Sequence, residues 1–297
     1  MDIADTVEDS RFLSHIGVWP GPRQLDVEGW LSNFDTEQDL AIAIALLEAY
    51  VHINEEQIGY AVSSTIRGIS TRPEFGDAEE RPAKWNAFIA TAMISFPLAG
   101  EGDSTASGFI FARIASQLGF PEQHISDSEH LVQRLAADNA STPIIFLDDL
   151  AASGTQFTRN WRRQYSTSKG LLSLAQLRNI GLSGAVYYLP VVSTTAAKKK
   201  IESECDAVTV LPTYLLEDDY GALAESTRLV RQEMRAALPD FLKRYSPRTG
   251  NGEFGAAGFG DLGLALSFHH GSPNNTLPVL QWGSPRPEWK PLVSQGL

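Results

Sequence analysis

Residues 144–156 read I-I-F-L-D-D-L-A-A-S-G-T-Q, and they give the clearest indication of the fold class. Its four apolar residues, 144–147, are typical of a strand buried on both faces, as in a parallel sheet covered by helices. Asp148 and Asp149 follow where such a strand would end, at the sheet edge where open α/β proteins bind ligands. Small residues and then a polar segment, 156–163, come next, and we interpret that segment as a helix.

The turn between the acids and this helix has the chemistry of an anion site. A small-residue turn before a helix presents backbone N–H groups to an anion, aided by the helix dipole. Carboxylates accept hydrogen bonds from sugar hydroxyls, so the stretch describes a ribose-phosphate site. An ordinary strand running into an Asp-containing turn is the alternative. The candidate catalytic residues are Asp148 and Asp149, and the candidate ribose-phosphate-binding residues are Ala151, Ala152, Ser153, Gly154, Thr155 and Gln156.

The same stretch resembles the signature of the type I phosphoribosyltransferases. That signature has four apolar residues, two acids and a small-residue loop ending in T-G-G-T or D-T-G-x-T. Asp148 and Asp149 match the acids, and Ser153-Gly154 match the T-G pair. Gln156 departs from the pattern, because the family usually has a second hydroxyl residue there. The backbone cradle survives this change, whereas one side-chain contact to the phosphate is put in doubt.

Composition and charge exclude several classes of protein. The formal net charge of -12 disfavours direct nucleic-acid binding, which needs clustered Lys and Arg. The only compact basic run, Lys198 to Lys200, is expected to form the solvated face of a helix. Cys205 is the only cysteine, so no intrachain disulfide is possible and a reducing compartment fits. We expect it to be a buried small residue rather than a catalytic thiol.

No membrane segment or secretory signal is visible in the sequence. The acidic residues 1–10 lack a basic segment followed by an apolar core. The longest apolar run, 41–53, is interrupted by Glu48 and is too short to span a bilayer. We therefore expect a cytoplasmic protein without a membrane partner.

The order of the expected elements predicts a doubly wound parallel α/β sheet, because strands and helices alternate through the central region. We divide the chain into a helical N-terminal extension (1–85), a phosphoribosyltransferase-like α/β core (86–215) and a C-terminal part (216–297) with a long helix and a glycine-rich cap. The expected strands are 93–97, 144–147, 185–192, 207–211 and 264–268. The expected helices include 108–118, 128–138, 169–179, one that carries the three lysines, and 220–238, which Pro239 would end.

Two short patterns predict helix starts in the N-terminal extension. Asp35 and Gln38 have the spacing of a capping box before an apolar helix, and Asn54 and Gln57 repeat it before a second helix. In the C-terminal part, six glycines between Gly250 and Gly263 indicate either a close-packed or mobile cover or a disordered linker.

Phosphoribosyl transfer also requires neutralisation of the leaving pyrophosphate, usually by Mg²⁺ with a cationic side chain. The candidate pyrophosphate loop is Glu101, Gly102, Asp103, Ser104 and Thr105, between an expected strand and helix. Mg²⁺ would bind through Asp103 or Asp149. The loop contains no Lys or Arg, and a Gly/Ser surface turn explains its composition about as well.

The C-terminal run from His269 to Pro278 supplies candidates for a base or acceptor pocket. Asn274 and Asn275 have donor and acceptor pairs, and His269 and His270 can transfer protons near neutral pH. The segment Ser272-Pro273-Asn274-Asn275 is also a good turn, which is the alternative interpretation.

Taken over residues 35 to 285, the chain resembles the phosphoribosyltransferase-like proteins of bacterial conflict systems, which occur beside anti-phage modules, including some retrons. The resemblance implies an effector that binds a nucleotide or phosphoribosyl pyrophosphate and acts at the anomeric carbon, by pentosyl transfer or N-glycosidic cleavage. It also implies an ATPase partner, in some systems with a reverse transcriptase. A non-catalytic nucleotide sensor and a structural subunit of a defence complex are the alternatives.

Overall fold

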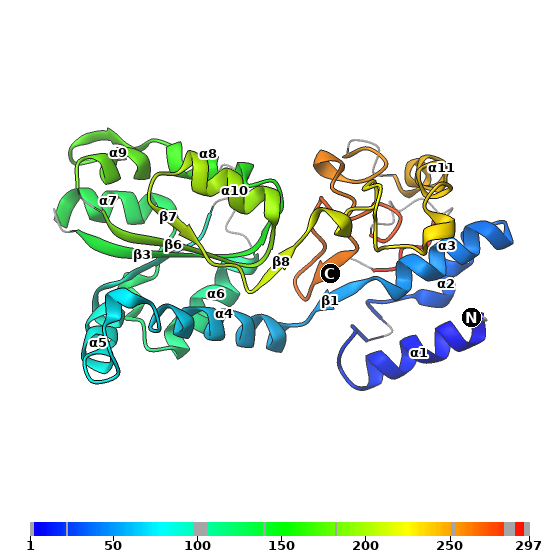
Figure 1. Ribbon diagram of the computed structural model, residues 1–297, viewed down its shortest axis with the longest axis horizontal. Helices are drawn as coiled ribbons and strands as arrows, with labels where there is room; N and C mark the ends of the chain where they lie inside the picture. Colours follow the sequence, from blue (N-terminus) through cyan, green and yellow to red (C-terminus); the bar gives the residue numbers. More distant parts are fainter. Residues whose placement is uncertain are drawn as a thin grey trace. The chain divides into compact units, whose positions relative to one another are not determined.

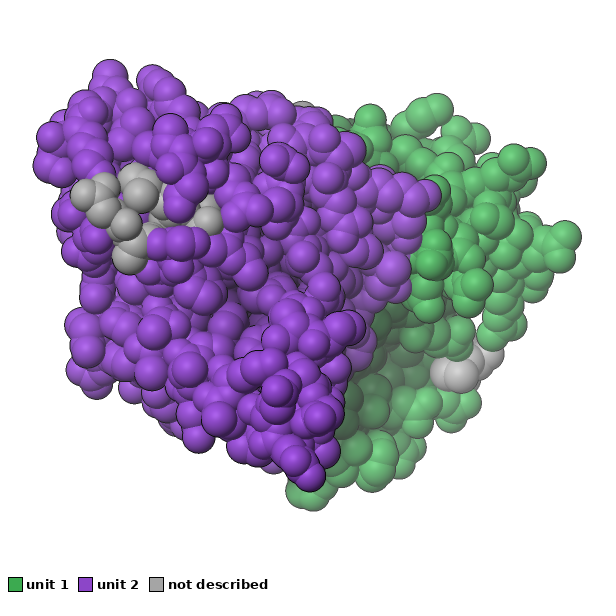
Figure 2. All heavy atoms as spheres, turned by 60° about the vertical axis from the view of Figure 1, so that its left-hand side comes forward, with its two compact units in different colours: residues 1–57, 217–297 green, residues 58–216 purple. Residues whose placement is uncertain are grey.

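The computed structural model of the chain describes residues 3–21, 23–97, 106–138, 141–181, 183–250, 254–281 and 289–293. The chain forms two compact units, which Figure 2 shows in different colours. Residues 58–216 form one unit, here called the core unit. Residues 1–57 and 217–297 form the other, here called the terminal unit, in which the two ends of the chain fold together.

This division differs from the three consecutive regions expected from the sequence. The boundary near residue 216 agrees, but the N-terminal boundary lies at 57/58 rather than near 85. The second helix after Asn54 therefore belongs mostly to the core unit. The N-terminal extension and the C-terminal cap are not separate appendages, because they share one hydrophobic core.

The core unit contains the predicted parallel sheet. Its strands are β2 (Met93–Ser95), β3 (Thr142–Ala151), β6 (Ser183–Thr194), β7 (Val208–Val210) and β8 (Tyr214–Leu216). They run in the order β2-β3-β6-β7, β8 also pairs with β6, and every pair is parallel. Residues 144–147 are fully buried, as their apolar run predicts. The expected α/β fold with a parallel sheet is confirmed.

Helices cover both faces of this sheet (Figure 1). One face carries α7 (Ser128–Asp138), α8 (Thr155–Arg162), α9 (Leu174–Asn179) and α10 (Thr195–Glu204). The other face carries α4 (Glu55–Ile69), α5 (Arg81–Thr91) and α6 (Ala106–Gln117). The single-turn helices of this unit are η1 (Pro73–Phe75) and η2 (Glu122–His124).

The segment 169–179 is not the single helix that we expected. Two short antiparallel strands, β4 (Tyr165–Thr167) and β5 (Gly170–Leu172), precede a helix that begins at Leu174. The cause is Ser173, whose hydroxyl accepts the backbone N–H of Gln176, while the Gln176 side chain accepts the backbone N–H of Ser173. This capping box fixes the start of α9.

The terminal unit is held together by segments far apart in the sequence. Its helices are α1 (Ile3–His15), α2 (Val27–Leu31), α3 (Glu37–Glu48) and α11 (Leu238–Tyr245). Strands β1 (Val51–Ile53) and β9 (Leu266–Phe268) form a parallel pair. The indole N–H of fully buried Trp30 donates to the carbonyl of Val279 at 2.6 Å. Its hydrophobic core draws on both chain segments.

The predicted long helix 220–238 is wrong. The chain there forms the short turns η3 (Asp218–Tyr220) and η4 (Gln232–Met234), and α11 begins at Leu238. Pro239 stands in the first turn of α11, where its missing N–H costs nothing because that group has no intrahelical partner. Pro239 therefore starts a helix instead of ending one. Two further turns, η5 (Ser246–Thr249) and η7 (Phe259–Asp261), follow in this segment.

The described part of the glycine-rich segment, 254–263, is closely packed. Gly258 has φ +77, and a Cβ on it would lie 2.7 Å from the carbonyl oxygen of Thr276. Neighbouring Ala257 is fully buried. Of the two alternatives for the glycine-rich segment, a close-packed or mobile cover and a disordered linker, the close packing is correct for these residues.

The helix start expected at Asp35 lies one residue later, and it has an N-cap residue in place of the expected capping box. Thr36 caps α3 by accepting the backbone N–H of Asp39, and its hydroxyl donates to the Asp39 carboxylate at 2.8 Å. The second expected box is confirmed, because Asn54 and Gln57 exchange side-chain to backbone hydrogen bonds.

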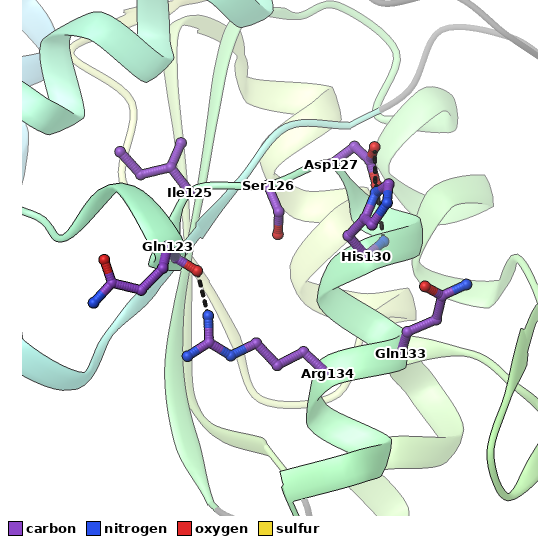
Figure 3. Close-up of a pocket in the computed structure, with 7 residues that line it drawn as sticks. All are labelled: Gln123, Ile125, Ser126, Asp127, His130, Gln133 and Arg134. Carbon is purple, nitrogen blue, oxygen red and sulfur yellow. Dashed lines mark hydrogen bonds and ion pairs between the residues drawn. The ribbon is translucent and has the colours of Figure 1, made fainter.

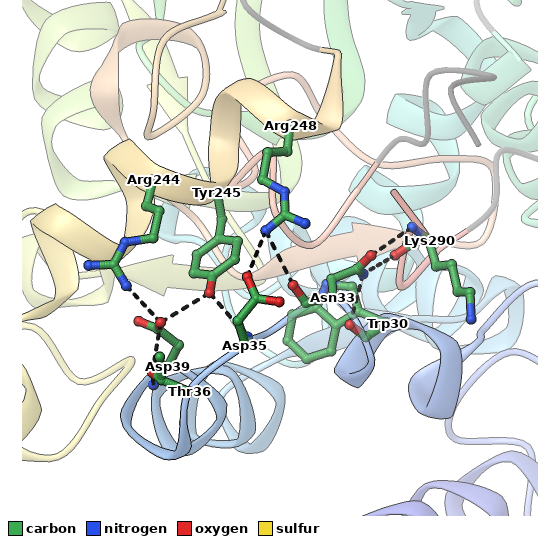
Figure 4. A network of polar contacts seen from close by, with 9 residues as sticks. All are labelled: Trp30, Asn33, Asp35, Thr36, Asp39, Arg244, Tyr245, Arg248 and Lys290. Atoms are coloured by element: carbon green, nitrogen blue, oxygen red, sulfur yellow. Dashed lines mark hydrogen bonds and ion pairs between the residues drawn. The ribbon is translucent and has the colours of Figure 1, made fainter. Parts of the chain in front are cut away.

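Asp39 also joins α3 to α11 through a polar network (Figure 4). Its buried carboxylate accepts from the Arg244 guanidinium at 2.7 Å and from the Tyr245 hydroxyl at 3.0 Å. Asp35, four residues earlier, pairs with Arg248 at 3.3 Å, but its side chain is 73% exposed. Of these two carboxylates, that of Asp39 is the one isolated from water, and its hydrogen-bond partners offset the free-energy cost of burying it.

We predict that Asp39→Asn lowers the free energy of unfolding by about 2–4 kcal/mol, because the Arg244 charge and the Tyr245 hydroxyl lose a buried charged acceptor. Urea denaturation followed by tryptophan fluorescence measures the change. The matched control is Asp35→Asn, which removes an exposed ion pair and should cost no more than about 0.5 kcal/mol. Equal effects of the two substitutions would contradict the structural role of Asp39.

Candidate active site

The predicted site residues lie where β3 leads into α8. Strand β3 extends through Ala151, so Asp148 and Asp149 lie inside it and not after its end, as we had expected. Asp148 stands opposite Pro190 of β6, and Ala151 stands opposite Ser193. The longer pairing holds the two acids on a rigid strand at the carboxyl end of the sheet.

Asp148 and Asp149 form a coupled pair of carboxyl groups. Asp148 is only 6% exposed. It accepts the Tyr188 hydroxyl at 2.6 Å and the backbone N–H of Asp149 at 2.9 Å. A further hydrogen bond joins the two carboxyl side chains. Asp149, which is half-buried, accepts the backbone N–H of Leu150 at 2.7 Å.

The environment favours a proton on the inner acid of the pair. Burial raises the pKa of Asp148 well above its usual range, and the neighbouring charge of Asp149 raises it further. The Tyr188 hydroxyl opposes this shift by hydrogen bonding to the carboxylate, and burial also raises the pKa of Tyr188 itself. The pair therefore has an enclosed inner acid with a raised pKa and an outer acid that lies closer to solvent.

An aromatic stack fixes the inner acid. The Tyr188 ring stacks on Phe157 of α8 with centroids 4.1 Å apart, and Phe157 also meets Phe146 of β3 edge-on. The hydroxyl that binds Asp148 thus comes from a ring held between the sheet and α8.

The turn before α8 is shaped by a close approach to α10. Gly154 caps α8 with φ +71, a left-handed conformation that favours glycine. A Cβ on Gly154 would lie 3.0 Å from the carbonyl oxygen of Ala197 and 3.1 Å from the side chain of Ile201. The Thr194 hydroxyl donates to the carbonyl of Ala152 at 2.7 Å. The structural reason for glycine at 154 is therefore packing against α10.

The side chains of the turn face three different partners. Ser153 accepts the backbone N–H of Thr155 at 3.4 Å. The Thr155 hydroxyl accepts a hydrogen bond from the Lys200 ammonium at 2.8 Å. Gln156 is exposed, and its side-chain amide lies 3.5 Å from the carbonyl of Pro97. Position 156 therefore points back toward the end of the β2 segment.

The structure adds Lys200, which the sequence did not single out and which lies beside the turn that leads into α8. The expectation that Lys198 to Lys200 form one solvated face is wrong, because only Lys199 is exposed. Lys198 donates to the carbonyl of Val210 at 2.9 Å, and Lys200 reaches the start of α8. Ala197 and Ile201 are four residues apart, a spacing that indicates one apolar helix face, and both are buried in the structure. This pattern could have indicated that the lysines next to them lie beside the packed face of the helix.

The candidate pyrophosphate loop lies outside the described residues, so the roles of Glu101, Gly102, Asp103, Ser104 and Thr105 stay predictions. Among the described residues no group of three or more His, Cys, Asp or Glu side chains is arranged to hold a metal ion. Binding of Mg²⁺ through Asp149 stays a prediction, and a single carboxylate is compatible with it because Mg²⁺ commonly keeps several waters and binds substrate oxygens.

The candidate acceptor residues belong to the terminal unit and not to the core unit. Asn275 is buried, and its amide donates to the carbonyl of Phe259 at 2.8 Å, so it has a structural partner. Asn274 is exposed. His269 is exposed and lies 3.5 Å from Glu55.

Two further histidine environments lie in the same unit. The His270 ring stacks on Phe268 with centroids 5.5 Å apart. The structure adds His52, a buried histidine that the sequence did not single out and whose Nδ1 lies 2.8 Å from the Ser267 hydroxyl. Burial lowers the pKa of His52 to about 4, and the charges of His269 and His270 add to this shift.

The core unit also has a surface hollow that no sequence motif indicated. Figure 3 shows this cavity of about 660 Å³ beside α7. Ile125 in its wall pairs with Ile94 of β2, so the hollow lies along the outer edge of the sheet. Arg134 donates to the Gln123 carbonyl, and the His130 ring meets the Asp127 carboxylate at 2.8 Å. No residue of the predicted site lines it; its walls are Gln123, Ile125, Ser126, Asp127, His130, Gln133 and Arg134.

Two other expectations can be compared with the structure. Cys205 is fully buried, and burial raises the pKa of its thiol to about 12, which fits a structural residue rather than a nucleophile. Within the part of the chain that the structure describes, no helix has the length and apolar character needed to cross a membrane.

Comparisons with known proteins agree with the sequence motif. A sequence model of the PRTase-CE family, named for phosphoribosyltransferases, matches residues 27–295. This match confirms the expected phosphoribosyltransferase-like fold. A search of curated proteins found no significant match. A solved structure, the orotate phosphoribosyltransferase from Aeropyrum pernix, is 14% identical and aligns over 52% of this chain and 70% of its own, with a TM-score of 0.27. That likeness is too weak to support any argument.

We predict that Gly154→Ala is more destabilising than an ordinary glycine substitution at positive φ. The strain should cost about 1 kcal/mol and the displacement of α10 a further 1–3 kcal/mol or so. The control is Gly181→Ala, because Gly181 has φ +76 but no atom within 4 Å of an added Cβ. Thermal unfolding of both variants measures the difference. A loss at Gly154 no greater than that at Gly181 would contradict the close packing of the turn on α10.

The shift at Asp148 predicts a pH dependence of stability. Because the folded state holds the Asp148 proton more tightly than the unfolded state, ionisation should cost stability as pH rises from about 4 toward the raised pKa, by up to roughly 1.4 kcal/mol per pH unit. Asp148→Asn should remove this loss, so that the variant gains stability relative to the native chain as pH rises. Urea denaturation at several pH values measures it, with exposed Asp206→Asn as control. Parallel curves for the native chain and Asp148→Asn would show that Asp148 ionises normally.

Proposed function

Because the chain belongs to the PRTase-CE family, we propose that it binds a ribose 5-phosphate group, as part of a nucleotide or of phosphoribosyl pyrophosphate, and acts at the anomeric carbon. The observation that carries this proposal is the order of groups along one strand and turn. A rigid acid pair at the end of β3 is followed within a few residues by the start of α8. The spacing suits a ligand with a diol and a phosphate on one five-membered ring.

The two acids have different roles in this proposal. Asp149, the outer and less buried acid, accepts hydrogen bonds from the ribose hydroxyls. Asp148 is enclosed and already bonded to Tyr188, so it orients Asp149 and keeps the pair from carrying two full charges. The phosphate binds the backbone N–H groups of residues 152–156, with the positive end of the α8 dipole behind them.

The proposed reaction breaks the bond between the anomeric carbon and its leaving group. In pentosyl transfer the leaving group is pyrophosphate and the acceptor forms a new bond to carbon 1. In N-glycosidic cleavage the base leaves and water attacks. Mg²⁺, when bound, would neutralise charge on the leaving pyrophosphate. The carboxylate of Asp149 stabilises positive charge that develops on the ribose ring as the bond breaks.

We extend this proposal to an effector role in a bacterial anti-phage system, as the resemblance implies. The partner would be an ATPase, in some systems with a reverse transcriptase. The net charge of -12 suits docking on a basic protein better than direct contact with nucleic acid. Exposed apolar side chains on α1, such as Phe12, which is 60% exposed, are further candidates for a protein contact.

A second candidate function is nucleotide sensing without turnover. The enclosure of Asp148 favours it, because only one carboxylate of the pair is then presented to a ligand. Binding without product formation, in the presence and absence of the genomic neighbours, would distinguish the sensor from the enzyme.

We predict that Asp149→Asn weakens binding of phosphoribosyl pyrophosphate or a nucleoside 5′-monophosphate by about 10- to 100-fold, since charge-assisted hydrogen bonds to the ribose are lost. Isothermal titration calorimetry measures the affinity, and the reaction mixture is analysed for pyrophosphate or free base with and without Mg²⁺. Asp206→Asn, an exposed substitution in the same unit, should bind like the native chain. Unchanged affinity in a folded Asp149→Asn protein would refute the ribose contact.

A further inference from the structure

The start of α8 has a cationic partner from another helix. The Lys200 ammonium, on α10, donates to the hydroxyl of Thr155, the first residue of α8, at 2.8 Å. Both side chains are half-buried. The backbone N–H groups at this helix end are the ones proposed to hold the phosphate. Lys200 therefore places a positive charge at the same end of the helix as the phosphate cradle.

This ammonium is not neutralised by a carboxylate in the described part of the chain. Lys198, two residues earlier, has Glu202 as an ion-pair partner, and Arg162 has Glu204, whereas Lys200 has only the neutral hydroxyl of Thr155. A half-buried charge held by a neutral acceptor gains much more from an anion than an exposed one does.

The stretch of sequence that precedes Lys200 is also basic, in contrast to the chain as a whole, whereas Glu202 and Glu204 follow Lys200 on α10. From residue 150 to residue 201 the sequence contains no Asp or Glu. The same stretch, which supplies α8, α9 and most of α10, contains Arg159, Arg162, Arg163, Lys169, Arg178, Lys198, Lys199 and Lys200. Although Arg162 and Lys198 pair with Glu204 and Glu202, the positive charges of this stretch outnumber its negative charges, in contrast to the net charge of -12 for the chain.

We propose that Lys200 is the specificity-determining residue of the site, and that it selects ligands with a phosphate monoester dianion over their unphosphorylated counterparts. The inference rests on the proposed function and specifies in addition that the ligand carries a doubly charged phosphate group. When the phosphate binds, the Lys200 ammonium donates to a phosphate oxygen, and Thr155 keeps it aimed at that position. The phosphate cradle therefore does not depend on the second hydroxyl that Gln156 replaces, because the ammonium supplies the missing contact.

A purely structural tether between α10 and α8 is the competing explanation of the same contact. A tether would change stability when removed, but it would not distinguish phosphorylated from unphosphorylated ligands or alter the salt dependence of binding. The experiment therefore has to measure both the relative affinity for phosphorylated and unphosphorylated ligands and the stability of each variant.

The test uses the full chain and titrates it calorimetrically with ribose 5-phosphate and with ribose at several salt concentrations. Lys200→Met should weaken ribose 5-phosphate binding by about 10- to 100-fold and flatten its salt dependence. Lys200→Arg, which keeps the charge, should stay within about threefold of the native chain, since Arg also binds phosphate. The matched control is Lys199→Met, which removes the same charge one residue away from an exposed position and should bind normally.

The outcomes separate this inference from the proposed function. If the native chain binds ribose 5-phosphate and a folded Lys200→Met protein binds it with the same affinity, the role of Lys200 is overturned. The proposed function then still stands. Failure of the native chain to bind any ribose phosphate would refute the proposed function itself. Equal losses in Lys199→Met and Lys200→Met would show a general charge effect and would also overturn the specific role. Circular dichroism spectra and thermal unfolding confirm that each variant is folded.

Discussion

The close approach of α10 to the turn at Gly154 is the constraint on which the site depends. A glycine in the left-handed conformation lets the chain leave β3 and enter α8 while the backbone of Ala197 lies against it. The hydroxyl of Thr194, the residue before α10, donates a hydrogen bond to the carbonyl of Ala152 in this turn. The acid pair, the helix start and Lys200 come from three elements, and this contact fixes their mutual positions. A site built on packed elements can hold its polar groups in place before any ligand arrives.

The sequence predicted what depends on local pattern. The apolar run 144–147, the acids after it and the capping residues Asn54 and Gln57 are neighbours along the chain, so their structure follows from spacing. What it missed depends on contacts between distant residues. Pairing of β1 with β9 joins residues more than 200 positions apart, and no local pattern announces it. The role of Lys200 likewise follows only once α10 is known to pack on α8.

Coupling between the two acids changes how the family motif should be read. In the sequence alone, the two adjacent acids are equal candidates for binding a sugar diol. Here one is enclosed beneath Tyr188 and has a raised pKa, while the other lies nearer the solvent. Two full charges at this distance would repel each other, and this repulsion adds to burial in raising the pKa of Asp148. The motif therefore divides into an enclosed acid, Asp148, and an outer acid, Asp149, which we propose contacts the ligand.

The insertion of the core unit into the terminal unit affects the order in which the chain can fold during synthesis. Residues 1–57 leave the ribosome before the core unit, but their partners in the terminal unit begin only at residue 217. The intervening core unit can therefore form its sheet and its site while the first segment still has an incomplete hydrophobic core. Closing so long a loop favours late completion of the terminal unit. The segment translated after the core unit is thus the one that buries the segment translated before it.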